Sequence, residues 1–83
     1  MTNTEIANRL QEHARQLRQR HNNLYRVRAY RQAAEAVERF DCPIEALLHE
    51  KGRPALEEIP GIGKRLALTI ARYLETGEWQ ARN

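Results

Sequence analysis

Apolar residues recur at three- and four-residue spacing along most of the chain, the pattern of helices that bury one face. The positions of the first stripe are Ile6, Leu10, Ala14 and Leu17, and those of the second are Val27, Tyr30, Ala33, Ala34 and Val37. A polar break at residues 21–23 separates the two, and the second stripe runs to about Phe40. No stretch alternates apolar and polar residues with period two, so we expect no strands.

Capping residues mark where the first two helices begin. Thr2 or Asn3 can cap the first helix, with Glu5 in its first turn. Asn22 or Asn23 can cap the second. The sequence therefore predicts two long helices joined by a short polar turn.

The second half of the chain predicts two short helices followed by a longer one. Residues 41–43, Asp-Cys-Pro, suggest an N-cap followed by a first-turn proline, and Gly52 ends the short helix that follows. Pro54 begins the next short helix, and a tight turn follows over residues 60–63. The last helix is expected to end at Gly77 in a left-handed conformation.

The chain length and composition limit the fold to one small domain. Because 83 residues supply one hydrophobic core, residues 1–83 are expected to form a single all-α domain, a compact bundle of four to five short helices. The lone cysteine, Cys42, excludes an internal disulfide, and the scattered histidines do not fit a structural zinc site. Since we find neither a membrane span nor a signal-peptide core, we expect a cytoplasmic protein without a membrane partner, associated with the nucleoid if the source is prokaryotic.

Positive charge is concentrated in the first half of the chain. Residues 1–40 carry eight arginines and four glutamates, whereas residues 41–83 carry six basic and seven acidic residues. Residues 15–31 contain six arginines and no carboxylate. The planar donor fork of arginine matches phosphate oxygens. This local excess indicates an anionic partner and favours nucleic acid over a membrane surface.

The turn at residues 60–63, Pro-Gly-Ile-Gly, is the most specific motif. Its glycines allow a sharp turn with positive φ and a close approach to another surface, while Ile62 is expected to point into the core. Free N–H groups at the start of the next helix, together with Lys64 and Arg65, predict a phosphate site. A Walker-type loop and a dinucleotide fold are excluded by the glycine spacing and by the lack of a preceding strand. The alternative is a turn that only joins two helices.

The sequence resembles helix-hairpin-helix domains, and in particular the small N-terminal domain of X-family DNA polymerases of the polymerase beta type. The resemblance is carried by Tyr25-Arg-Val-Arg-Ala-Tyr-Arg-Gln-Ala-Ala, by the Pro-Gly-Ile-Gly turn and by Tyr73-Leu-Glu-Thr-Gly. It covers about residues 3–80, here standing alone without a polymerase domain. It implies a bundle that grips nicked, gapped or 5′-phosphorylated DNA by its backbone, without reading sequence, in DNA repair or maintenance.

The candidate DNA-binding residues come from the turn, the arginine cluster and the resemblance. They are Tyr25, Arg26, Arg28, Tyr30, Arg31, Gly61, Ile62, Gly63, Lys64 and Arg65. The resemblance implies that Arg26, Tyr30 and Arg65 bind a 5′-phosphate and that Tyr25 stacks on a base. Tyr30 also lies on the apolar stripe, so a purely structural role in the core is the alternative.

The resemblance also implies a monovalent cation. The backbone carbonyls of Glu57, Ile59 and Ile62 would hold Na⁺ or K⁺ at the hairpin and bridge it to a phosphate. No other cofactor is expected.

Catalysis is not expected, because the residue that would carry it is missing. In polymerase beta this domain is also a lyase, whose lysine amine forms a Schiff base with an abasic sugar. The matching position here is Thr69, and a hydroxyl cannot form an imine. Two alternatives stay open: a weak abasic-site lyase that uses Lys64, Lys51 or the N-terminal amine, and a helical bundle that binds another protein, such as a repair protein.

The remaining polar and aromatic residues are expected to have structural roles. Cys42 is expected to be buried or half-buried. Tyr73 and Trp79 are expected to pack near the C-terminus, although an exposed Trp79 could instead anchor a partner. The histidines expected to be solvated are His13, His21 and His49.

Overall fold

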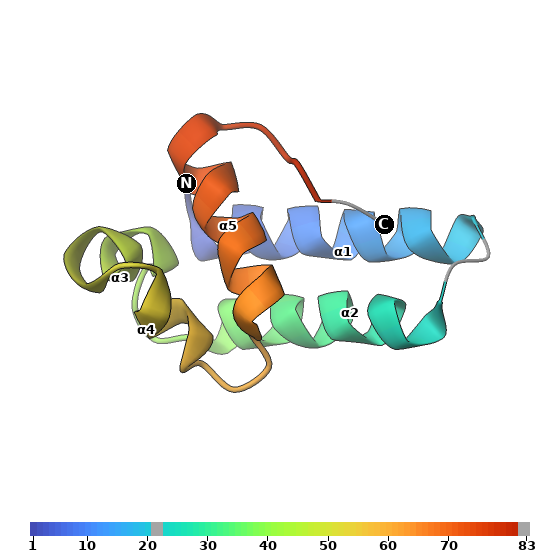
Figure 1. Cartoon of the computed structure of the whole chain (residues 1–83), viewed down its shortest axis with the longest axis horizontal. Coiled ribbons are helices and arrows are strands. Elements are labelled where there is room, and N and C mark those ends of the chain that lie inside the picture. The colour runs from blue at the N-terminus through green and yellow to red at the C-terminus, as the bar shows by residue number, and fades with distance from the viewer. Residues whose placement is uncertain (21–22, 82–83) are drawn as a thin grey trace.

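The computed structural model describes residues 1–20 and 23–81. It contains five helices in these ranges and no strand (Figure 1). They are α1 (Asn3–Gln19), α2 (Leu24–Arg39), α3 (Ile44–Lys51), α4 (Arg53–Glu57) and α5 (Lys64–Thr76). The all-α class and the number of helices predicted from the sequence are confirmed.

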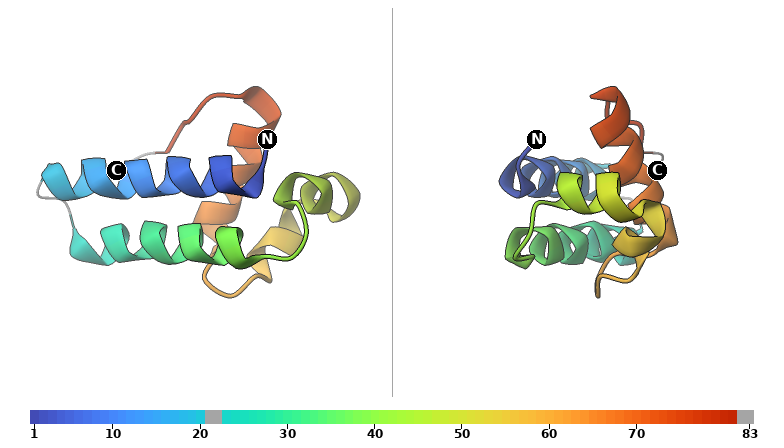
Figure 2. Two further views of the ribbon diagram at one scale, coloured as in Figure 1. Left: turned by 180° about the vertical axis from the view of Figure 1, so that it is seen from behind. Right: turned by 90° about the vertical axis from the view of Figure 1, so that its left-hand side faces the viewer.

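The helices form two layers. α1 and α2 run antiparallel side by side, and α5 crosses them on one side (Figure 1). Seen from behind, the opposite side of the α1–α2 pair is left uncovered by any other helix (Figure 2, left). α3 and α4 lie together at one end of the molecule. This arrangement leaves the turn between α4 and α5 beside α2.

The apolar stripes predicted from the sequence meet in one core. The largest side chains that are completely buried are Ile6, Leu10, Leu17, Val37, Ile44, Leu56 and Ile70. Burying each aliphatic side chain of this size favours folding by about 1.5–3 kcal/mol. Tyr30 belongs to this core with only 6% of its surface exposed.

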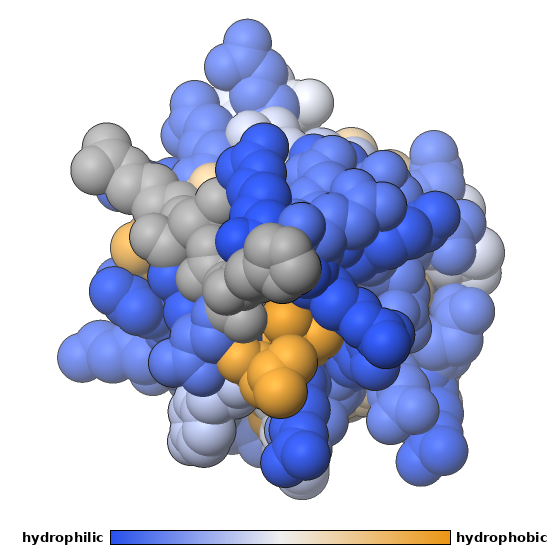
Figure 3. All heavy atoms as spheres, turned by 90° about the vertical axis from the view of Figure 1, so that its right-hand side faces the viewer, coloured by the Kyte–Doolittle hydropathy of each residue, from blue (hydrophilic) through white to orange (hydrophobic). Residues whose placement is uncertain are grey.

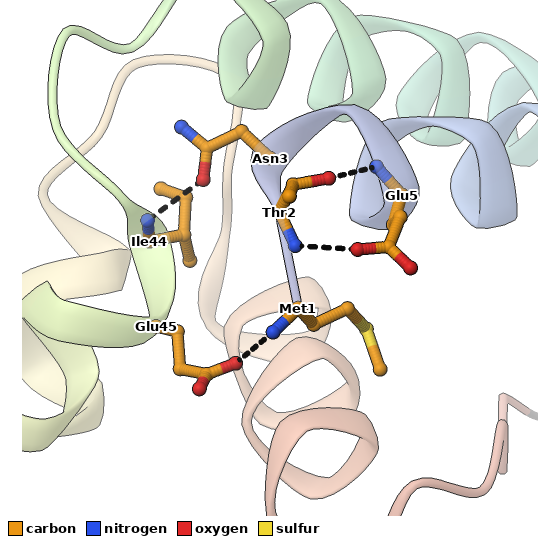
Figure 4. A network of polar contacts seen from close by, with 6 residues as sticks. All are labelled: Met1, Thr2, Asn3, Glu5, Ile44 and Glu45. Carbon is orange, nitrogen blue, oxygen red and sulfur yellow. Dashed lines mark hydrogen bonds and ion pairs between the residues drawn. The ribbon is translucent and has the colours of Figure 1, made fainter.

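The caps of α1 and α2 follow the sequence prediction. The side chain of Thr2 accepts a hydrogen bond from the backbone N–H of Glu5, and the Glu5 carboxylate accepts one from the N–H of Thr2 (Figure 4). These two bonds form a capping box, which satisfies two N–H groups at the helix start. Asn23 caps α2 by accepting a hydrogen bond from Tyr25 N at 2.8 Å. The alternative cap, Asn22, lies outside the described residues.

The start of α3 differs from the prediction. Pro43 occupies the N-cap position without a side-chain cap, and the helix begins at Ile44, so Asp41 is not the cap. Asn3 takes this role from α1: its Oδ1 accepts a hydrogen bond from Ile44 N at 2.8 Å (Figure 4). Its Nδ2 donates a second hydrogen bond to the carbonyl of Cys42 at 2.9 Å. A cap supplied from 41 positions away in sequence leaves no local signal.

Two predictions of exposure are wrong. His13 is buried, with 5% of its surface exposed, because the segment after α5 returns along α1 and Trp79 packs onto it. Cys42 is exposed rather than buried, because it lies in the connection before α3. His49 is exposed as predicted, and His21 lies outside the described residues. The packing role predicted for Trp79 is confirmed, since it is partly buried against the core.

Candidate nucleic-acid interface

The turn between α4 and α5 is anchored by two isoleucines. Ile59 and Ile62 are buried, and the N–H of Ile62 donates a hydrogen bond to the carbonyl of Ile59 at 2.9 Å. The inward direction predicted for Ile62 is confirmed by its 2% exposure. Anchoring on both sides of the turn holds the start of α5 in a fixed position against the core.

The two glycines of the turn have different roles. Gly61 has a φ of +96°, and a Cβ added there would lie 3.3 Å from Ala36 Cβ and 3.4 Å from the carbonyl oxygen of Gln32. It therefore provides both the turn and the close packing against α2. Gly63 has a φ of −85° and ψ of 179°, a conformation open to any residue, and no atom of the described residues lies within 4 Å of its added Cβ. The predicted positive φ is wrong at Gly63, whose missing side chain leaves open space instead.

Gly63 is also the N-cap of α5, and in the described part of the chain no side chain caps this helix. The first backbone N–H groups of a helix have no intrahelical acceptor, and the helix dipole adds positive potential there. α5 is 13 residues long, which is enough to develop this dipole. The open space at Gly63 gives an anion access to this helix start.

A groove with a volume of about 500 Å³ runs between α2, the turn and α5. Its cationic lining residues are Arg26, Lys64, Arg65 and Arg72, and no acidic residue lines it within residues 1–20 and 23–81. Tyr25 and Gln32 line it from α2, and Gly61 and Gly63 line it from the turn. The groove thus joins the start of α5 to a concentration of positive charge.

The structure brings most of the predicted DNA-binding residues to this groove. Those that line it are Tyr25, Arg26, Tyr30, Gly61, Gly63, Lys64 and Arg65. Ile62 is buried beneath the turn, so its side chain is structural. Arg28 and Arg31 are exposed on α2 but do not line the groove.

Tyr25 and Tyr30 occupy different depths. Tyr25 is 79% exposed and leaves its ring accessible from solvent. Tyr30 is buried in the core, where its ring centroid lies 4.6 Å from that of His13 and 6.4 Å from that of Trp79. The core role considered for Tyr30 is confirmed, and only a small part of it borders the groove.

Thr69, the residue that the sequence resemblance predicts to match the lyase lysine, lines the same groove. Its hydroxyl donates a hydrogen bond to the carbonyl of Arg65 at 3.1 Å, one turn earlier in α5. Lys64 lines this groove as well. The groove therefore contains one lysine, at the helix start, and a hydroxyl one and a half turns further along.

The sequence analysis missed several groove residues, among them Arg72 and Gln80. Arg72 follows Arg65 by seven residues, a spacing that keeps the two on similar faces of a helix, so the sequence held a signal for it. Gln80 reaches the groove from the segment after α5. No periodicity could have predicted the path of that segment.

A second groove of about 630 Å³ lies between α3, α4 and α5. Glu45 and Glu75 line it together with Arg53 and Arg72, so charges of both signs meet there. Mixed charge makes it a weaker site for a polyanion than the groove beside α2.

The cation predicted at the carbonyls of Glu57, Ile59 and Ile62 stays a prediction. The Ile59 carbonyl already accepts the hydrogen bond from Ile62 N, which leaves one lone pair for a further contact. Among residues 1–20 and 23–81, no cluster of three or more histidine, cysteine or acidic side chains could hold a metal ion.

Comparison with known proteins identifies the fold family. None of the helices in the described part of the chain is both long and apolar enough to cross a bilayer. No curated protein and no solved structure shows significant similarity to the chain. The family model of the helix-hairpin-helix domain matches residues 1–79. This match does not indicate a specific relation to the X-family polymerases. The match spans nearly the whole chain and includes α4, the turn and α5, and the chain therefore belongs to the helix-hairpin-helix domain family.

Proposed function

We propose that this chain binds DNA without sequence preference by holding the phosphate backbone in the groove between α2 and α5. Helix-hairpin-helix domains generally bind DNA in this nonspecific way. The observation that carries the proposal is the lining of the groove, where Arg26, Lys64, Arg65 and Arg72 meet without an acidic residue in the described part of the chain. Backbone contacts of this kind bind phosphate and do not read bases.

The turn supplies the closest contact in this proposal. A phosphate approaches Gly63, where no side chain intervenes, and accepts hydrogen bonds from the first N–H groups of α5. Lys64 and Arg65 neutralise it from the same helix start, and Arg72 extends the positive potential along the groove. A bound Na⁺ or K⁺ at the hairpin carbonyls belongs to the same proposal.

The ligand that we propose for the groove is DNA with a 5′-phosphate at a nick or gap. A terminal phosphate carries more charge than an internal one and offers more oxygens to Arg26 and Arg65. The exposed ring of Tyr25 lies on the same groove and can stack on a base that a gap leaves unpaired. This preference for a nick or gap rests on the resemblance to the polymerase domain. On the same resemblance we propose a function in DNA repair or maintenance, in the cytoplasm or nucleoid.

A titration with gapped, nicked, intact duplex and single-stranded DNA of one sequence tests the proposal. If about four to six phosphates are neutralised, the log–log slope of affinity against salt on duplex DNA is roughly −4 to −5. Removal of the 5′-phosphate from gapped DNA is expected to weaken binding. A flat salt response, or a strong preference for one base sequence, would contradict backbone binding. Absence of binding at low salt would favour the protein-binding alternative, to be tested by pull-down with repair proteins.

The proposed function is binding without catalysis. The competing lyase function is favoured by one observation, that Lys64 shares the groove with Thr69. The other two candidate amines do not line this groove: Lys51 ends α3, and the Met1 amine is paired with Glu45 at 2.7 Å. Borohydride reduction on a 5′-deoxyribose-phosphate end separates the two functions, because only a lyase leaves a trapped covalent adduct.

A further inference from the structure

The segment after α5, residues 77–81, returns along α1, and we call it the strap (Figure 1). Gly77 turns the chain out of α5 with a φ of +77°, and the Thr76 hydroxyl accepts a hydrogen bond from the N–H of Glu78 at 3.1 Å. Beyond Glu78, the backbone of residues 79–81 forms no hydrogen bond within the described part of the chain. A segment held only by side chains can detach while the helices stay folded.

Trp79 anchors the strap among aromatic and cationic side chains. Its indole N–H donates a hydrogen bond to Nδ1 of His13 at 3.1 Å, and the two ring centroids lie 5.5 Å apart. Its ring also lies 5.3 Å from that of Tyr73 and 5.1 Å from the guanidinium carbon of Arg9. Ala81 is the other strap residue that is partly buried against the core. The docking of the strap therefore depends mainly on one indole ring.

The strap forms part of the wall of the groove. Gln80 lines the groove together with Arg26 and Tyr30. Tyr30 also borders the anchor, since its ring centroid lies 4.6 Å from that of His13 and 6.4 Å from that of Trp79. With the strap docked, only 6% of the surface of Tyr30 is exposed. The position of the strap thus sets how far this end of the groove is open.

His13 can hold the strap only in its neutral form. A doubly protonated imidazole has two N–H donors and no acceptor, so it would face the indole N–H of Trp79 with a second donor. The charges that act on His13 are all positive, from Arg9 and Arg20 on α1 and from Arg26 on α2. Burial, and then these charges, lower the pKa of His13 below its ordinary value of 6.5, so docking is lost only as the pH falls below that value.

We propose that the strap partly closes the groove in the free protein, and that protonation of His13 and binding of a DNA backbone each release it. The proposal rests on DNA binding in the groove and adds the regulation of that site. Release removes Gln80 from the wall and carries away Glu78, the one charged residue of the strap. It also uncovers the guanidinium of Arg9 and leaves a positive charge on His13. Because coupling between two binding events is reciprocal, each event favours the other.

The fluorescence of Trp79 reports the position of the strap, because the sequence contains one tryptophan. Seen from the end where α2 begins, the surface is largely hydrophilic with a small hydrophobic area, so this face offers a released indole no large apolar site (Figure 3). Between pH 7.5 and pH 5, the emission maximum of the wild-type chain is expected to shift to longer wavelength while the helical circular dichroism stays constant. His13→Gln still accepts the bond but does not titrate, so its emission should not shift.

Anisotropy titrations with one DNA duplex at the same two pH values connect the strap to the groove. The affinity of the wild-type chain is expected to rise at least about threefold more toward pH 5 than that of His13→Gln. His49 is exposed and does not line the groove, so His49→Gln should respond as wild type does.

Two strap variants separate the anchor from the rest of the segment. Trp79→Ala releases the strap at any pH, so it should bind DNA more tightly than wild type at pH 7.5 and respond less to pH. Gln80→Ala leaves the anchor in place and should keep the wild-type response. If Trp79→Ala loses its helical signal, the comparison of wild type with His13→Gln decides the proposal by itself.

Failure of the strap and failure of DNA binding give different results. If the wild-type chain binds no duplex at either pH, the proposed function fails and the strap has no site to regulate. If it binds DNA but responds to pH as His13→Gln does, the strap does not control the groove. The proposal is also wrong if added duplex leaves the emission wavelength at pH 7.5 unchanged. Loss of the helical signal together with the emission shift would overturn release of the strap as a separate step.

Discussion

The indole N–H of Trp79 donates a hydrogen bond to Nδ1 of His13 at 3.1 Å, which ties the segment after α5 to the middle of α1. The Trp79 ring also packs edge-on against Tyr73, at a centroid distance of 5.3 Å, and lies 5.1 Å from the guanidinium carbon of Arg9. Because Nδ1 accepts this bond, the ring proton of His13 resides on Nε2, which is buried without a partner among the described residues. A doubly protonated ring could not accept the bond.

The bond between Trp79 and His13 makes stability depend on pH. Burial lowers the pKa of His13 below its ordinary value of 6.5, and the positive charges of Arg9, Arg26 and Arg20 lower it further. As the pH falls through the ordinary histidine pKa of 6.5, His13 takes up a proton in the unfolded chain before it does so in the folded one. The free energy of unfolding therefore decreases toward acidic pH. We expect the urea midpoint to drop between pH 7.5 and pH 5.5.

Two histidine variants test that assignment. Gln at position 13 can still accept the bond from Trp79 but does not titrate, so His13→Gln is expected to flatten the pH dependence in this range. His49 is exposed on α3, so His49→Gln is expected to keep the wild-type slope. An unchanged slope in His13→Gln would show that another group is responsible.

The helices could be predicted from the sequence because their signals are local. The stripes around Leu10 and Val37, the capping box at Thr2 and the left-handed Gly77 follow from nearest neighbours along the chain. The burial of His13 could not be predicted in this way, because it depends on a tail that returns from 66 positions away.

Some residues of the groove could also be predicted, because their signals in the sequence are local. Arg26 and Arg65 were found because a charge cluster and a turn motif each mark their position in the sequence. Which arginines share a surface depends instead on how the helices pack. The structure places Arg26 in the groove, whereas Arg28 and Arg31 on the same helix do not line it.

Substitutions of the two glycines of the turn are expected to have different effects, one on the stability of the fold and the other on DNA affinity. Gly61→Ala forces a side chain into positive φ and against Ala36, so it is expected to destabilise the fold by about 1–3 kcal/mol. Gly63→Ala fits the backbone and meets no neighbour, and the entropic gain and the poorer N-cap cancel to within about 0.5 kcal/mol. Its added methyl group lies where a phosphate would approach, so DNA affinity should fall.

Urea unfolding and anisotropy titrations measure these two effects. Each variant is the control for the other, because the substitution is the same and the positions are two residues apart. Unchanged DNA affinity in a folded Gly63→Ala protein would mean that the turn only joins α4 and α5.

The cap that Asn3 supplies to α3 should contribute measurably to stability. Asn3→Ala removes the hydrogen bonds to Ile44 N and to the Cys42 carbonyl, and we expect a loss of about 1–2 kcal/mol in the free energy of unfolding. Asn8 is exposed on α1, so Asn8→Ala is the matched control and should change stability by less than about 0.5 kcal/mol. Equal effects of the two variants would contradict the capping role.

Arg72 should contribute to DNA binding although the sequence analysis missed it. Arg72→Gln is expected to weaken binding to duplex DNA uniformly across sequences and to reduce the salt slope by about one. Arg53 lines only the groove of mixed charge, so Arg53→Gln should leave both quantities nearly unchanged. Equal losses in the two variants would indicate general attraction to the net positive charge instead of contact in the groove.

Position 69 is where an amine should convert binding into covalent chemistry. Schiff-base formation needs a deprotonated amine, and a free lysine has a pKa of about 10.4. Thr69→Lys places an amine in the groove beside Arg65 and Arg72, whose positive charges favour the neutral amine. We expect weak borohydride trapping on a 5′-deoxyribose-phosphate end with this variant, and only the background of an exposed amine with the wild-type chain.

The matched control is Thr76→Lys. Thr76, like Thr69, donates its hydroxyl proton to the carbonyl four residues earlier in α5, but it does not line the groove. Because its new amine would lie away from the bound sugar, we expect no trapping above background. Efficient trapping by the unmodified protein, lost in Lys64→Ala, would overturn the assignment of binding without catalysis, since Lys64 is the lysine that shares the groove with position 69.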